Sequence, residues 1–109
     1  MATQAGRNLQ ELIATALAPY PERPPAEGVA LLIDDLITCG QRLHDAAVRI
    51  PQNQRAPKIT SAVDEWEYVS AVGPRSSEPN ANWNHARGLA RIARALISAL
   101  SEYESSAVQ

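Results

Sequence analysis

The chain has 109 residues, enough for one domain with a single hydrophobic core. Its hydrophobic fraction of 45% is too high for a disordered chain, and with few aromatics and no Phe its apolar content suits closely packed helices. The net charge of −2 argues against a dedicated nucleic-acid binder, and the sole cysteine, Cys39, excludes an internal disulfide and a cysteine-rich zinc site. We therefore expect one all-α domain over residues 1–109.

The first half of the sequence predicts a short helix followed by a long one. In segment 8–20 apolar side chains recur at intervals of three and four residues, Asn8 is a suitable N-cap, and a proline stops the helix. Segment 25–50 keeps one apolar stripe, with Pro25 in its first turn, where proline is tolerated. Gly40 lies on this stripe, where a mid-helix glycine costs about 1 kcal/mol relative to alanine. We therefore expect a close backbone crossing at Gly40.

The second half predicts the same alternation. A short helix over 60–72 carries Trp66 on its apolar side, starts with a Thr-Ser pair able to cap it, and ends at a Gly-Pro pair. A long helix starts after Asn82 or Asn84 and continues to about Glu104. No alternating β-branched run and no Asn-Gly hairpin signal occurs. The sequence therefore predicts an antiparallel four-helix bundle of short, long, short and long helices.

The remaining segments are expected to be connections and ends. Residues 1–7 and 105–109 are predicted to be frayed tails, and residues 74–82 a mobile loop. Trp83 is expected to precede the last helix and to pack onto it as a hydrophobic staple.

The last helix carries more apolar surface than a simple amphipathic helix needs. A second strip beside the main stripe consists of Gly88, Ile92, Ala95 and Ala99. Two interpretations stay open: a central helix that touches two neighbours, or a face for a protein partner or a second copy of the chain. Leu31, on the polar side of the second helix, is a weaker indication of the second interpretation, which predicts a homodimer.

Three arginines, Arg87, Arg91 and Arg94, fall within a narrow arc of the same helix. They can bind carboxylates of the neighbouring acidic helix or of a partner, or the phosphates of nucleic acid. With a negative net charge and no helix-turn-helix spacing before them, carboxylates are the preferred expectation and nucleic acid is disfavoured.

The sequence offers little that indicates catalysis. No metal-ligand spacing, glycine-rich phosphate loop or nucleophile motif is present, so we predict no catalytic, cofactor-binding or metal-ligating residue and no enzyme. His44 and Cys39 lie at opposite edges of the apolar stripe of the second helix, and structural roles are the simplest reading for both. The alternative places them at the edge of a ligand pocket between the second and fourth helices.

Two stretches of the sequence carry a resemblance. They are "RPPAEGVALLIDDLITCGQRLHDAAVRIP" and "HARGLARIARALISALSEYE", within the span from about Pro24 to Glu104. The chain resembles a family of small actinobacterial helical proteins of unknown function that are often found beside natural-product biosynthesis genes. The resemblance implies no established activity and no catalytic residues. What it implies is an accessory or regulatory role in an actinobacterial cytoplasm.

The function hypothesis combines these observations. We expect a non-enzymatic interaction or regulatory module that self-associates through its last helix. A cytoplasmic location is expected because the sequence shows neither a hydrophobic signal core nor an apolar run of about 18 residues, which also argues against a membrane span. The alternatives are a DNA-associated regulator that uses the arginines and a small-ligand-binding accessory protein with an inter-helix pocket.

Overall fold

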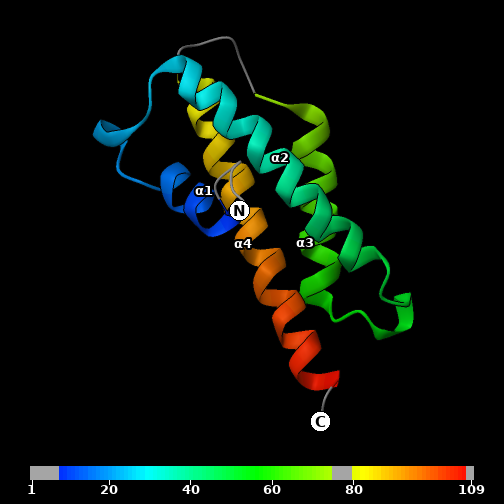
Figure 1. Cartoon of the computed structure of the whole chain (residues 1–109). Coiled ribbons are helices and arrows are strands. Elements are labelled where there is room, and N and C mark those ends of the chain that lie inside the picture. The colour runs from blue at the N-terminus through cyan, green and yellow to red at the C-terminus, as the bar shows by residue number, and fades with distance from the viewer. Residues whose placement is uncertain (1–7, 75–79, 108–109) are drawn as a thin grey trace.

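The computed structural model describes residues 8–74 and 80–107, and the described part is all-helical, which confirms the predicted fold class. Two short 3₁₀ helices, η1 and η2, flank the second of four α-helices in chain order. The elements are α1 (Leu9–Ala16), η1 (Tyr20–Glu22), α2 (Ala26–Val48), η2 (Gln52–Gln54), α3 (Pro57–Val72) and α4 (Ala81–Ala107). Figure 1 shows that α3 runs in the opposite direction to α2 and α4.

The helix starts follow local backbone chemistry, and those of α2, α3 and α4 correct the sequence prediction. Asn8 caps α1 as expected, since its side-chain Oδ1 accepts a hydrogen bond from the backbone N–H of Glu11 at 2.9 Å. At α3 the helix begins at Pro57, three residues before the predicted start. Proline suits this position because its ring presets the helical φ and the missing N–H has no partner in the first turn anyway. The predicted Thr-Ser cap at residues 60–61 is therefore wrong, because both residues lie inside the helix.

The other corrected boundaries concern α2 and α4. Pro25 occupies the N-cap position of α2 rather than its first turn. Helix α4 begins at Ala81, so Trp83 lies inside the first turn as a buried core residue rather than as a staple before it. The predicted loop 74–82 is thus shorter than expected, and its residues 75–79 lie outside the described residues, as do the predicted tail 1–7 and residues 108–109. Residues 105–107, predicted to fray, continue α4.

Both α2 and α4 contact all three other α-helices, and α4 makes the more extensive contacts, which places it at the centre of the fold. The largest fully buried side chains come from all four helices: Leu12, Leu32, Leu36, Ile59, Trp66, Leu89 and Leu96. Ile92 and Ala99, half of the strip expected to face a partner, are buried within the chain itself. The prediction of a self-association face on this strip is therefore wrong for both residues, and the alternative of a central helix with two neighbours accounts for them.

Gly40 is explained by the indole ring of Trp66, and not by the backbone crossing expected from the sequence. A Cβ atom built on Gly40 would lie 2.6 Å from Cζ2 and 2.7 Å from Cζ3 of that ring, far inside van der Waals contact. The indole Nε1–H of Trp66 donates to Oε1 of Gln41 at 3.1 Å, which fixes the ring against α2. Only glycine leaves room for Trp66 at this place.

No helix in the described part of the chain combines the length and the apolar character that a membrane span requires.

Candidate binding cleft between α3 and α4

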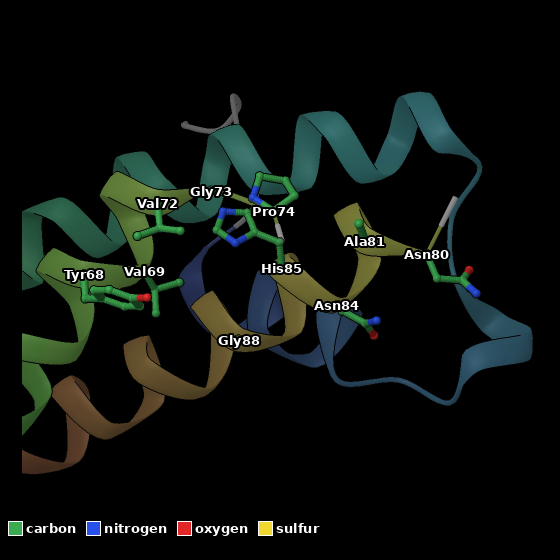
Figure 2. Close-up of a pocket in the computed structure, with 10 residues that line it drawn as sticks. All are labelled: Tyr68, Val69, Val72, Gly73, Pro74, Asn80, Ala81, Asn84, His85 and Gly88. Atoms are coloured by element: carbon green, nitrogen blue, oxygen red, sulfur yellow. The ribbon is translucent and has the colours of Figure 1, made fainter. Parts of the chain in front are cut away.

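A cleft of about 710 Å³ lies between the last turns of α3 and the first turns of α4 (Figure 2). This volume falls within the range of roughly 300–1,000 Å³ that is usual for small-molecule sites. The residues that line it are Tyr68, Val69, Val72, Gly73, Pro74, Asn80, Ala81, Asn84, His85 and Gly88. Sequence reasoning did not find this cleft, because it depends on how the ends of two helices are placed in space.

The local sequence produces this opening in two ways. At the end of α3, Gly73 adopts a left-handed φ of 76° while its N–H still donates to the carbonyl of Val69 at 3.2 Å, and Pro74 then prevents a further helical turn. On α4, Gly88 contributes no side chain, and a Cβ atom built on it would meet nothing within 4 Å. The cleft is therefore open above Gly88 because no side chain fills that position.

Two apolar side chains of α3 form an exposed edge of the cleft. Tyr68 is 65% exposed and Val72 52% exposed, and the two residues lie one helical turn apart. Large apolar side chains left in solvent beside a concave surface are typical of binding sites.

His85 is the polar group inside this apolar surrounding. Its side chain extends from α4 toward Gly73 and Pro74 at the end of α3 (Figure 2), and only 8% of the residue is exposed to solvent. Among the residues that the structure describes, none forms a hydrogen bond with its imidazole ring. Burial lowers the pKa of His85 below its ordinary value, so the ring is neutral at pH 7 and offers one N–H donor and one nitrogen acceptor.

Arg87, the first of the three predicted anion-binding residues, has a different partner from the expected carboxylates. Its Nη1 donates to the backbone carbonyls of Ala16 at 3.2 Å and Ala18 at 2.9 Å, at the end of α1. Its guanidinium carbon also lies 5.8 Å from the ring centroid of Trp83. The carboxylate prediction is wrong for Arg87 because these helix-terminal carbonyls, which carry partial negative charge, take its donors.

Arg91 and Arg94 are exposed, and neither forms a hydrogen bond or ion pair with any residue that the structure describes. Arg87 thus has a structural role, whereas the side chains of Arg91 and Arg94 are free to contact another molecule. Of the predicted strip on α4, Gly88 lines the cleft and Ala95 is half-buried against the core. Leu31 of α2 is 64% exposed, as the sequence suggested.

His44 links α2 to α3, and neither His44 nor Cys39 lines the cleft. The Nε2 atom of His44 lies 2.7 Å from Oε2 of Glu67, and its Nδ1 atom lies 3.1 Å from Oδ1 of Asp45. Burial lowers the pKa of His44, but the hydrogen bonds with Glu67 and Asp45 raise it by more, so that the net shift is upward. Cys39 is half-buried against the core.

The pocket predicted near His44 and Cys39 does not coincide with the cleft, or with a smaller cavity of about 450 Å³ beside Trp83. Sequence reasoning placed His44 at the edge of the stripe but missed Glu67 as its partner. The described residues contain no group of three or more His, Cys, Asp or Glu side chains that could hold a metal ion.

In its described part the chain is a small all-helical protein with a mainly apolar cleft at a helix junction. A model of the family of unknown function DUF6415 matches residues 7–104. The chain therefore belongs to a family of unknown function, as the resemblance in its sequence implied. No curated protein and no solved structure matches the chain.

Proposed function

We propose that the protein is a non-enzymatic accessory or regulatory protein that binds a ligand in the cleft between α3 and α4. The observation that carries this proposal is the buried imidazole of His85, which has no hydrogen-bond partner among the described residues. A buried polar group without a partner costs about 1–3 kcal/mol, so native proteins rarely retain one. A bound ligand would supply the missing partner.

The surroundings of His85 support the same proposal. The cleft has the volume of a small-molecule site, and Val69 and Val72 give it an apolar wall around one buried polar group. Sites for small molecules usually combine such walls with a few polar groups that orient the ligand.

The test is a comparison of the wild-type protein with a variant whose cleft is filled. In Gly88→Leu the new side chain would occupy the open space over Gly88, and the substitution favours the helix. Ala30→Leu adds a large side chain at an exposed position of α2 and is the matched control. Each protein is incubated with a small-molecule extract of the source cells, separated by gel filtration and examined by mass spectrometry.

We expect wild type and Ala30→Leu to retain the same small molecule and Gly88→Leu to lose it. If all three proteins retain the same molecules, or none retains any, the proposed function is wrong.

Self-association is a second candidate function, and the exposed apolar side chains Leu31, Tyr68 and Val72 favour it. The homodimer that we expected from α4 would then use these positions in place of the buried Ile92 and Ala99. Light scattering on wild type and on Leu31→Ser and Tyr68→Ser tests this candidate. A dimer that either substitution weakens supports it, and a monomer up to about 1 mM, a concentration that reveals even weak association, excludes it.

A DNA-associated role is less well supported, since it would rest on Arg91 and Arg94 alone. Salt-titrated binding to duplex DNA tests it, and the role is excluded if Arg91→Glu leaves the affinity unchanged.

The cellular setting and the exact helix arrangement remain proposals as well. The actinobacterial cytoplasm and the link to natural-product biosynthesis rest on the sequence resemblance. The direction of α3, opposite to α2 and α4, supports an antiparallel four-helix bundle, whereas α2 and α4 run in the same direction although they contact each other (Figure 1).

A further inference from the structure

We propose that the cleft selects uncharged, mainly apolar small molecules that carry a hydroxyl or carbonyl oxygen, and that His85 is the group that binds this oxygen. The inference rests on the proposed function and deepens it by naming the class of ligand.

The first argument is the absence of charge. None of the described residues that line the cleft is Asp, Glu, Lys or Arg. From these residues an ionic ligand would gain no opposite charge to offset the hydration that it loses on entering the cleft, and this loss is expensive in an apolar surrounding. Phosphorylated compounds, carboxylates and amines are thus disfavoured, and uncharged molecules are not.

The second argument is the distribution of polar and apolar groups along the cleft. Val69, Val72 and Ala81 form apolar walls on both sides of the imidazole, whereas Tyr68 and Asn80 lie toward opposite ends of the view in Figure 2. A ligand that follows this pattern has an apolar body in contact with the valines and a polar atom within reach of His85.

The third argument is the protonation state of His85. Since burial lowers the pKa of His85, its ring is neutral at pH 7 and presents one donor and one acceptor. A carbonyl oxygen can accept from the N–H, and a hydroxyl group can either accept from it or donate to the other nitrogen. A neutral imidazole gives no electrostatic attraction to an anion, which agrees with the uncharged side chains of the described lining residues.

The experiment uses four soluble probes of similar size that differ in one group: benzyl alcohol, toluene, benzoate and benzylammonium. Dissociation constants are measured by NMR titration of the full-length wild-type protein, from backbone amide shifts of the cleft residues and from the ring nitrogen shifts of His85. At about −0.5 kcal/mol per non-hydrogen atom, molecules of this size have dissociation constants on the order of 1 mM, which this method can measure.

We expect benzyl alcohol to bind roughly 3–10-fold more tightly than toluene, as one added hydrogen bond predicts, and to shift the ring nitrogens of His85. Benzoate and benzylammonium should bind at least about 10-fold more weakly than benzyl alcohol. In His85→Leu the preference for the alcohol over toluene should disappear, while toluene still binds. His85→Gln, which keeps a donor and an acceptor, should restore part of that preference.

The results separate the two proposals. If none of the four probes shifts the cleft residues, the cleft does not bind small molecules and the proposed function itself fails. If the probes bind but an ion binds as tightly as benzyl alcohol, the cleft is a site and the inference about uncharged ligands is overturned. If the alcohol is preferred without any shift of the His85 nitrogens in wild type, or if His85→Leu keeps that preference, His85 is not the group that binds the oxygen.

Discussion

The substitution Gly40→Ala tests most directly how α2 and α3 pack. A methyl group at residue 40 would lie 2.6 Å and 2.7 Å from two ring carbons of Trp66, against a preferred separation of about 3.5–4.0 Å. Trp66 has little freedom to retreat, because it is fully buried and its Nε1–H is bonded to Gln41. Overpacking a core by one methyl group costs about 1–3 kcal/mol, and a ring this tightly held places Gly40→Ala near the upper limit.

The same substitution also brings a gain, since alanine favours the helix by about 1 kcal/mol over glycine. We therefore expect a net loss of about 2 kcal/mol in the free energy of unfolding. At roughly 4 °C per kcal/mol for a chain of this length, the melting temperature should fall by about 8 °C. Thermal and urea unfolding followed by circular dichroism at 222 nm measure both quantities.

Gly88→Ala is the matched control, because a methyl group there would meet nothing within 4 Å. It should raise the melting temperature by up to about 4 °C through the helix preference alone. Trp66→Phe, which shortens the ring over residue 40, should reduce the cost of Gly40→Ala in a double-mutant cycle. The reasoning is refuted if Gly40→Ala is as stable as Gly88→Ala, or if its cost is the same with Phe at residue 66.

Three further predictions concern single contacts. His44→Gln should be less stable than wild type at about pH 6, and this difference should disappear as the pH rises to about 9. The pKa of His44 is raised in the folded protein, so the stabilisation by the charged imidazole is complete below about pH 6.5 and is lost above the folded pKa. Melting temperatures of both proteins across this pH range measure the difference. Arg87→Met should lower the free energy of unfolding in urea by about 1.5–3 kcal/mol, because charged donors to the carbonyls of Ala16 and Ala18 are lost while the apolar stem remains. Asn8→Ala should cost about 1 kcal/mol in the same assay, through loss of the α1 cap.

Each of these has a control and a contradicting outcome. A difference between wild type and His44→Gln that stays constant or grows toward pH 9 would contradict the assigned ion pair with Glu67. Arg91→Met replaces an exposed arginine that has no partner among the described residues, so it should leave the free energy of unfolding almost unchanged. If Arg87→Met and Arg91→Met lower the free energy of unfolding equally, Arg87 does not stabilise the end of α1. Gln10→Ala is the exposed reference for Asn8→Ala, and an equal effect of both would show that the cap contributes nothing.

Much of the fold follows from local patterns in the sequence. The four helices, the cap at Asn8, the stop at Gly73 and the buried position of Trp66 were all predicted, because each depends on residues within a few positions of one another. The errors at the starts of α3 and α4 arise because neighbouring residues compete for the first helical position. Several residues near each start can serve as the first turn, and proline, which breaks a helix in its interior, is favoured at N1, where Pro57 lies.

The candidate site could not be predicted from local sequence patterns. The cleft depends on the separation between the end of α3 and the start of α4, and the ion pair between His44 and Glu67 depends on the register of α2 against α3. Neither the period of the apolar residues nor the charges specify these quantities. Arg87 is an example: its place on the polar arc of α4 was predicted, but its partners lie at the C-terminal end of α1 and just beyond it, about 70 positions away.

That contact has a consequence for the order in which the chain folds during synthesis. Helix α1 has only eight residues, too few for a stable helix in water, and its last carbonyls are satisfied by a side chain 71 residues later. Of the four described α-helices, α1 is synthesised first and must wait longest for its contact with α4. Until α4 is made, α1 can pack only against α2, and a chain that ends before Arg87 lacks the contact that closes the end of α1.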